Sequence, residues 1–352
     1  MTLAENKRLY DISTRLQVYT EGVKTQYQRE FDSVLSKVKT EFDKLLMNVQ
    51  YKTLDGMTKA ELTSLVRSLR TSQSKVFSTY TQKLLDQLND FMTADLEVNR
   101  RVYAATKFDP EADDLSDSEA IALIIADNKI NGYKALFGMA AITEDDSKLW
   151  ASVTNMPIAA NGLYLLPFLK TFSNSAQASI ENIVRKGYAN GWTVAETIDA
   201  VTSTKTKQGT SSQIHRIKIQ ADAVISTSIQ HVSGVVSEAL LSSIYNKYVW
   251  YSVIDSRTSD ICRSRNLNIY DYGVGPIPPA HINCRSHIAP LIGSTAFDAE
   301  TFYNWARRQP QDVQDDIFNG SIVKASDLEG WRYREPTTLE RFKNSVKRIL
   351  SR

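Results

Sequence analysis

Four side chains that can bind a metal ion lie close together late in the sequence: Cys262, His281, Cys284 and His287. Eighteen residues separate the first from the second, and two residues separate each later pair of neighbours. Sulfur and imidazole are ligands that structural zinc prefers, usually four in a tetrahedron, and short spacings are typical of such sites. The pattern therefore predicts a zinc site in which the metal closes the long first gap into a loop.

The same residues also have interpretations without a metal. Cys262 and Cys284 could form a small buried pair, with His281 hydrogen-bonded to a backbone carbonyl, or a disulfide outside a reducing compartment. Cys262 and His281 could also act as a nucleophile and its base. The sequence, however, contains no C-x-x-C, H-x-E, H-E-x-x-H, G-x-S-x-G or G-x-x-x-x-G-K-[ST] motif. We therefore expect that the chain is not an enzyme.

A strand and a turn precede the first cysteine. Residues 248–254 alternate and are rich in aromatic and β-branched side chains, which favours a β-strand. Asp255 and the three residues after it are turn formers, and the carboxylate can accept hydrogen bonds from the following amides. We expect the strand to end there, with Asp255 and Arg257 in polar contact across the turn. A loop rich in glycine and proline then leads to Pro278 and Pro279.

Together these residues resemble a known signature. A W-x-x-x-x-D-x-R-T run, a cysteine and a loop ending in P-P-x-H-x-x-C-R are similar to the signature of the phage head-morphogenesis family, also called Mu F-like minor head proteins. The matching residues are Trp250, Asp255, Arg257, Thr258, Cys262, Pro278, Pro279, His281, Cys284 and Arg285. Family members usually continue with C-R-C, whereas this chain has Ser286 at the last of these positions. His287, one residue later, would therefore have to supply the fourth zinc ligand.

The resemblance extends beyond the signature. Helical sequence, a G-W-T step and a long helix rich in small residues precede it, so the similarity covers about residues 175–292. A second element of the family is resembled by four residues that follow the signature: Trp305, Gln309, Gln314 and Gly320. In the signature itself we expect Asp255, Arg257, Thr258 and His281 to fix the turn and the loop of one compact fold.

The resemblance implies a structural protein of a tailed phage. Such a protein assembles with the portal protein and with the major capsid or scaffold protein during head morphogenesis. It would be found in the virion, inside the head near the portal, after assembly in the host cytoplasm. It could affect the packaging or the ejection of DNA, with packaged DNA as a further partner. The alternative is a metal-dependent maturation enzyme, a nuclease or peptidase, that uses the Cys/His cluster.

The first hundred residues have the pattern of two long helices. From Leu9 to Val49, apolar residues recur every three or four positions, as on one face of an amphipathic helix. Residues 54–56 form a turn, and Thr58 with Glu61 forms a capping box that begins a second helix, which extends to about Tyr103. Two helices of roughly 40 residues would each be about 60 Å long. We expect them to pair within one chain; the alternative is self-association as a coiled coil.

An acidic segment indicates a domain boundary. Residues 109–119 contain six acidic and no basic side chains, which is typical of a solvated linker. We therefore predict an elongated helical arm at 1–108, a helical domain at 120–298 that ends in the strand and the Cys/His signature, and a basic helical tail at 299–352. The predicted fold is mainly α, with a long N-terminal hairpin or coiled-coil arm and a compact α+β C-terminal domain.

Further patterns place helices and a basic segment in the central domain. Helical spacing covers residues 175–187, Thr193 with Glu196 forms a second capping box, and residues 214–245 form a long helix. Four basic residues lie near the start of that helix in a segment rich in Ser and Thr: Lys205, Lys207, Arg216 and Lys218. They form either a flexible loop or a loop that contacts the phosphates of nucleic acid.

Composition limits the class of protein. The chain has 352 residues, of which 42% are hydrophobic and 23% charged, with a formal net charge of +2. These values are ordinary for a soluble globular protein and give no strong overall attraction to nucleic acid or membrane. The N-terminus lacks the apolar stretch of a secretion signal, and apolar runs are shorter than the roughly 20 residues that span a bilayer. We expect the chain to be soluble and, with two cysteines, to be made in a reducing compartment.

Overall fold

The computed structural model describes residues 2–105, 144–203, 211–255, 257–294, 305–306, 309 and 314. The helices are α1 (Thr2–Met47), the 3-10 helix η1 (Leu54–Gly56), α2 (Lys59–Ala105), α5 (Glu144–Asn155), α6 (Leu165–Ala189), α7 (Val194–Thr202), α8 (Gln213–Leu241) and α9 (Asp260–Arg265). The strands are β1 (Lys247–Tyr251), β2 (Ile269–Asp271) and β3 (His287–Leu291). The predicted fold class is confirmed, because long N-terminal helices dominate and a small antiparallel sheet lies in the C-terminal region.

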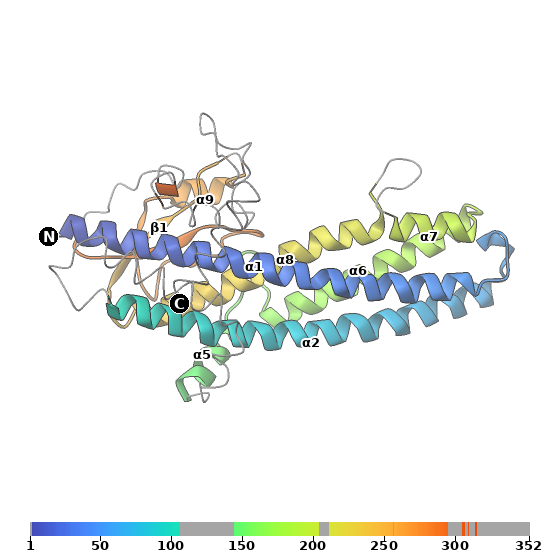
Figure 1. Cartoon of the computed structure of the whole chain (residues 1–352), viewed down its shortest axis with the longest axis horizontal. Coiled ribbons are helices and arrows are strands. Elements are labelled where there is room, and N and C mark those ends of the chain that lie inside the picture. The colour runs from blue at the N-terminus through green and yellow to red at the C-terminus, as the bar shows by residue number, and fades with distance from the viewer. Residues whose placement is uncertain are drawn as a thin grey trace, which may run out of the picture.

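The two longest helices form the predicted hairpin within one chain. α1 and α2 run side by side along the length of the molecule, and η1 lies at the turn between them (Figure 1). The capping box is present, since the Thr58 amide donates to the Glu61 carboxylate at 2.7 Å and the Glu61 amide donates to the Thr58 hydroxyl at 3.3 Å. Self-association between chains stays a prediction.

The hairpin is not a separate arm, so that prediction is wrong for the described residues. α6 and α8 pack along the hairpin, and one hydrophobic core is built from all four helices. The Phe31 ring of α1 lies 4.8 Å from that of Tyr80 in α2 and 5.9 Å from that of Phe172 in α6, between ring centroids. Detaching the hairpin would expose this core to water. The acidic segment 109–119 lies outside the described residues.

The helices α6, α7 and α8 follow the sequence pattern, with one exception. α6 begins at Leu165, earlier than the expected start at 175, and Pro167 lies in its first turn, where a missing backbone N–H breaks no helical hydrogen bond. Gly191, with φ of +64°, follows the end of α6. The capping box of Thr193 and Glu196 begins α7 as predicted.

A three-stranded antiparallel sheet carries the C-terminal motif. Its order is β2-β1-β3, so the predicted strand β1 is central. Trp250 lies opposite Ile288, and Tyr251 opposite His287. All residues of β3 are buried, and the strand packs against the first half of α1. The sheet and α9 therefore lie at the end of the elongated helical body where the N-terminus is found (Figure 1).

Parts of the predicted organisation fall outside the described residues. This holds for Lys205 and Lys207 and for most of the predicted tail 299–352. Trp305 and Gln309 are described and pack on α1: the Trp305 indole donates to Asp11, and Arg15 donates to the Gln309 amide oxygen at 2.9 Å. Among the described helices, none combines the length and the apolar composition needed to cross a membrane.

Candidate metal centre

The turn after β1 is built around a buried carboxylate. Asp255 Oδ1 accepts a hydrogen bond from the Arg257 amide at 2.8 Å, and the Asp255 amide donates to the Thr258 hydroxyl at 2.7 Å. The guanidinium of Arg285 donates to both carboxylate oxygens, at 2.8 and 2.7 Å. Burial raises the pKa of Asp255, but the hydrogen bonds and charge of Arg285 outweigh it and hold the pKa below its usual value.

The expected contact between Asp255 and Arg257 is therefore secondary. The Arg257 guanidinium lies 3.7 Å from the carboxylate, too far for a hydrogen bond, and its side chain is 35% exposed. Arg285, whose side chain is 13% exposed, makes the two-pronged contact instead. Because Arg285 follows Cys284 directly, this ion pair ties the second cysteine to the turn that precedes the first.

A short helix places the first cysteine. The hydroxyl of Ser259 caps α9 by accepting a hydrogen bond from the Cys262 amide at 3.4 Å. The thiol points from α9 into a small core with Tyr248 and Trp250. The indole of Trp250 donates a hydrogen bond to the Ser252 hydroxyl at 2.9 Å. The Ser252 hydroxyl in turn donates to the Cys262 carbonyl, also at 2.9 Å. Trp250 thus connects the strand to the helix that carries the thiol.

The loop that carries the second cysteine packs directly on α8. A Cβ atom at Gly234 would lie 2.2 Å from the carbonyl oxygen of Pro278, so only glycine allows this approach. The peptide bond between Pro278 and Pro279 is cis. Further along, the Asn283 amide donates to the Thr227 hydroxyl of α8 at 3.1 Å. The loop therefore contacts α8 at two points, Pro278 and Asn283, before it reaches Cys284.

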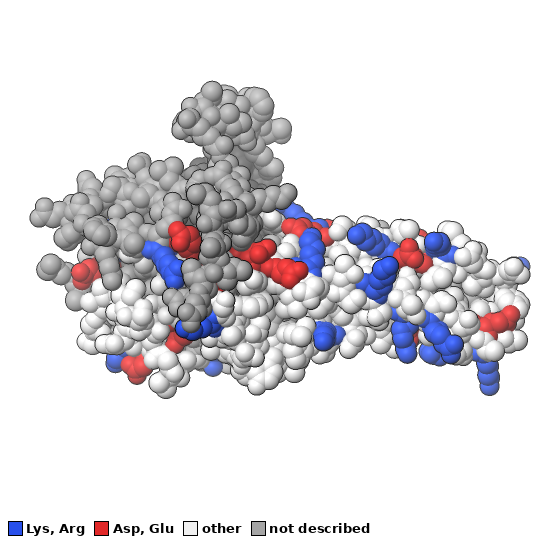
Figure 2. Space-filling view, turned by 90° about the horizontal axis from the view of Figure 1, so that it is seen from below, with Lys and Arg blue, Asp and Glu red and all other residues white. Residues whose placement is uncertain are grey.

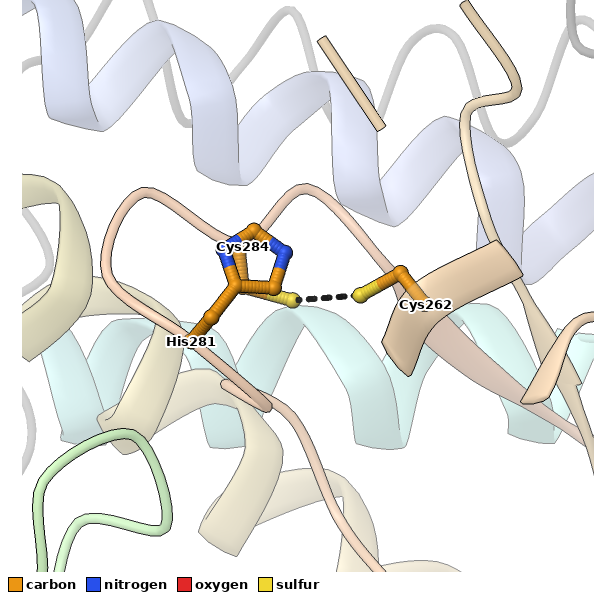
Figure 3. Close-up of side chains that lie close together, drawn as sticks. All are labelled: Cys262, His281 and Cys284. Carbon is orange, nitrogen blue, oxygen red and sulfur yellow. Dashed lines mark hydrogen bonds between the residues drawn. The ribbon is translucent and has the colours of Figure 1, made fainter. Parts of the chain in front are cut away.

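Cys262, His281 and Cys284 come together as predicted (Figure 3). One ligand atom from each lies within 4.8 Å of the others. The two sulfur atoms are 3.7 Å apart and belong to free thiols, whereas a disulfide requires about 2.05 Å. Two thiolates bound to one tetrahedral zinc at about 2.3 Å each would lie about 3.8 Å apart. The distance between the two sulfur atoms therefore already suits a shared metal ion, and the three side chains could bind one.

The protonation pattern also fits a ligand set. Hydrogen bonding to Cys262, and then to His281 and two backbone amides, holds the pKa of Cys284 well below its usual value against the effect of burial. The same contact between the sulfurs raises the pKa of Cys262. The hydrogen bond to Cys284 raises the pKa of His281. His281 Nδ1 lies 2.8 Å from the Ile282 carbonyl, so Nδ1–H can donate there and Nε2 can bind a metal.

His287 does not belong to this cluster, which corrects the predicted ligand set. It begins β3 and points toward α1, where Nε2 lies 3.2 Å from the Thr14 hydroxyl. Its ring stacks on Tyr251 with centroids 5.8 Å apart, and burial lowers its pKa to about 3. The fourth side chain beside the thiols is Ser286, whose hydroxyl contacts Cys262 and lies 3.0 Å from that of Ser252.

Two helical residues that sequence reasoning missed support the cysteine loop. The ammonium group of Lys24 in α1 is buried, pairs with Glu21 at 2.6 Å and donates to the Cys284 carbonyl at 3.3 Å. Gln230 of α8 donates to the Ser286 carbonyl at 3.2 Å. A signal was available, because Gln17, Glu21 and Lys24 recur at helical spacing beside the apolar seam of α1. A polar stripe of this kind indicates a second packed face.

The predicted nucleic-acid loop is only partly described. The ammonium group of Lys218 forms ion pairs with Asp32 at 2.7 Å and with Asp222 at 3.6 Å. Arg216 lies exposed in the first turns of α8. The charge of Lys218 is thus offset by neighbouring acids.

No family model, curated protein or solved structure matches this chain.

Proposed function

We propose that this chain is a structural minor head protein of a tailed phage. The observation that carries the proposal is the way the signature residues fold together. Trp250, Asp255, Cys262 and Arg285 are buried or nearly so, and they hold one strand, one turn and one loop in a single unit. Such residues have a structural role, as expected for a signature that defines an assembly module rather than a catalytic cleft.

A further detail supports the resemblance. Ser286 stands where similar proteins have the last cysteine of C-R-C, and its hydroxyl lies beside the Cys262 thiol. A cysteine at this position would therefore extend the cluster of Cys262, His281 and Cys284. Position 286, which is a cysteine in the family signature, is thus also the position whose side chain lies beside the Cys262 thiol.

The three-residue cluster is proposed to hold a structural zinc ion. Cys262, His281 and Cys284 would be its ligands, with the Ser286 hydroxyl or a water molecule beside them. When bound, zinc would supply a cross-link between α9 and the cysteine loop. Arg285 and Lys24 hold the loop on its two other sides, by Asp255 and by the Cys284 carbonyl respectively.

In this function the elongated helical body is the part that reaches along a partner. The unit formed by β1–β3 and α9 sits at one end, and the α1–α2 turn lies at the other (Figure 1). The partners proposed are the portal protein and the major capsid or scaffold protein, inside the head near the portal.

The alternative is a metal-dependent maturation enzyme, a nuclease or peptidase. Its supporting observation is that Cys284 lies in contact with His281. The hydrogen bond with Cys262, and then that with His281, lowers the pKa of the Cys284 thiol, and the contact raises the pKa of the imidazole, as in a nucleophile and base pair. The burial of both cysteines weighs against it, since Cys262 is 2% and Cys284 1% exposed. A substrate would have to displace the loop to reach either sulfur.

Mass spectrometry of purified particles tests the proposal. The chain is quantified against the portal protein in full heads and in heads emptied by triggered DNA release. A minor head protein is present in full heads in a few copies per portal, and its loss from emptied heads would identify an ejected component. Absence from both samples would reject the virion function and favour the enzyme.

A further inference from the structure

One face of the helical body concentrates positive charge. Between Lys59 and Lys83 of α2 and along the whole of α6 there are eight basic residues and two acidic ones. The entire chain has a net charge of only +2, so the remainder of the chain is net acidic. Figure 2 shows Lys and Arg side chains gathered on the half of the molecule that is farther from the grey residues.

The two helices lie side by side and antiparallel, which brings their charges onto one surface. Arg70 of α2 donates to both carboxylate oxygens of Glu181 in α6, at 2.8 and 2.6 Å. Farther along, the Thr81 hydroxyl lies 2.9 Å from that of Ser173. Glu181 is buried and paired, so it contributes no exposed negative charge. We call the exposed surface of this helix pair the basic face. Arg70 is left out because it pairs with Glu181, and the basic residues of the face are Lys59, Arg67, Lys75, Lys170 and Arg185.

Acidic side chains are nearly absent from the basic face. Glu61 is exposed at its outer end, and α2 has no further acidic residue before Asp86. Lys83 is left out because it pairs with Glu30 of α1 at 2.9 Å. Most of the other exposed side chains between the charges are short and polar, among them Ser64, Ser68, Thr71, Ser74, Ser78, Thr171, Asn174 and Asn182. Lys, Arg, Ser, Thr and Asn are the side chains that contact phosphate oxygens.

The basic face also lacks the exposed apolar and aromatic side chains that binding to a membrane or to single-stranded nucleic acid would need. The described residues include exposed large apolar side chains, but none lies between Lys59 and Lys83 or between Lys170 and Lys186. A helix that binds a membrane surface inserts an apolar face into the lipid. A surface that binds single-stranded nucleic acid stacks bases on aromatic side chains. Charge combined with short polar side chains instead fits the regular phosphate backbone of a duplex.

We propose that the basic face binds the phosphate backbone of duplex DNA without reading its sequence. From Lys59 to the level of Thr81, the face is about 33 Å long at 1.5 Å per residue. This length matches about ten base pairs, roughly one turn of a duplex that rises 3.4 Å per pair. DNA binding by this surface follows from the side chains of α2 and α6, and it does not require that the protein be part of a virion.

Binding is measured with the purified full-length chain and a fluorescent duplex of about 30 base pairs, by anisotropy at several salt concentrations. The test variant carries Arg67→Gln, Lys75→Gln and Arg185→Gln, which removes three charges from the basic face. The control variant carries Lys37→Gln, Lys39→Gln and Lys44→Gln, which removes three exposed charges from α1, where Glu41 and Asp43 lie among them. Circular dichroism checks that both variants fold.

The wild-type chain is expected to bind two duplexes of unrelated sequence equally, and duplex more tightly than single strands. In the test variant the plot of log affinity against log salt becomes shallower by about 2 to 3, since each phosphate contact contributes about 0.9. The control variant keeps the wild-type slope. Equal losses in the two variants, tighter binding to single strands or to anionic vesicles, or no binding by the wild type would overturn the proposal.

Discussion

Asp255 has two arginines within reach, and they differ in how they hold it. Arg257 belongs to the same turn and approaches only to 3.7 Å, whereas Arg285 comes from the far end of the loop and forms two short hydrogen bonds. The Asp255 side chain has no exposed surface. When a buried carboxylate loses its partner, the free-energy cost of burying its charge away from water is no longer offset. The two arginines should therefore contribute very unequally to stability.

We predict that Arg285→Gln lowers the free energy of unfolding by about 3 kcal/mol or more, while Arg257→Gln costs about 1 kcal/mol or less. Urea titration of each variant measures this. The pKa of Asp255 is lowered in the folded state, so the contribution of the pair is present above the ordinary pKa of about 4 and is lost as the pH falls through the folded value. The deficit of Arg285→Gln should shrink in acid. Equal effects of the two substitutions would contradict this account.

Asp95 of α2 is a second buried carboxylate, with the opposite shift. Burial raises its pKa to about 7, although Ser233 and Asn99 donate hydrogen bonds to it. The folded state therefore retains a proton that the unfolded chain releases near pH 4, and wild-type stability should fall as the pH rises from about 4 to about 7. The fall amounts to a few kcal/mol at about 1.4 kcal/mol per pKa unit.

Asp95→Asn removes this titration. Unfolding measured at a series of pH values should show the variant gaining stability relative to the wild type up to about pH 7. Asp86→Asn, at an exposed position of the same helix, is the control and should follow the wild-type curve more closely. Parallel curves for the wild type and Asp95→Asn would show that Asp95 titrates normally.

At the scale of elements, the contact between α8 and the cysteine loop depends on one missing side chain. A Cβ atom at Gly234 would meet the backbone of Pro278, which cannot swing away as a side chain can. Gly22, within α1, has no atom within 4 Å of the corresponding position. The two glycines are thus a matched pair, both within helices but only one in a close approach.

We predict that Gly234→Ala destabilises the protein by about 2 kcal/mol or more, because the loop must shift. Gly22→Ala should be neutral or stabilising by up to about 1 kcal/mol, as expected for alanine in a helix interior. Thermal unfolding of both variants gives the comparison. A mild effect at Gly234 would mean that the loop does not rest on α8.

Local signals account for what the sequence predicted correctly. Capping boxes at Thr58 and Thr193 and the apolar spacing of residues 9–49 act within one or two helical turns, so they can be read directly. β2 and β3 were not predicted, because a three-residue edge strand has no periodicity and β3 is buried on all sides. His287 appeared to be a ligand because its spacing suited zinc, but the alternation of β3 turns it toward α1.

For the whole molecule, the main correction is that the hairpin and the C-terminal elements form one body. The acidic segment indicated a boundary, and the polar stripe of α1 that marks its second packed face was overlooked. Buried polar contacts reveal it: Lys24 reaches the Cys284 carbonyl, and Asn6 exchanges two hydrogen bonds with the backbone of Ile292 at 3.0 and 2.9 Å. The partner of each lies far away in the sequence, so neither could be predicted from local spacing.

Because the cysteine loop is bound to α1 and α8, an ion held by Cys262, His281 and Cys284 should stabilise the helices as well as the loop. A ligand at 100 times its dissociation constant contributes about 2.7 kcal/mol to the folded state. In a chain of this size such a gain raises the midpoint of unfolding by about 4 °C. The shift should appear in the helical signal, although the metal site itself contains little helix.

The most direct test of this account follows thermal unfolding by far-ultraviolet circular dichroism, with zinc and with a chelator. The account predicts one helical transition that zinc raises by about 4 °C in the wild type and in His287→Gln. The shift should be lost in Cys284→Ser and in His281→Asn, the second substitution being at a half-buried position that the fold can tolerate. An identical transition with zinc and with chelator in the wild type, or a zinc shift that persists in both ligand variants, would contradict the claim that the Cys/His unit clamps the helical body.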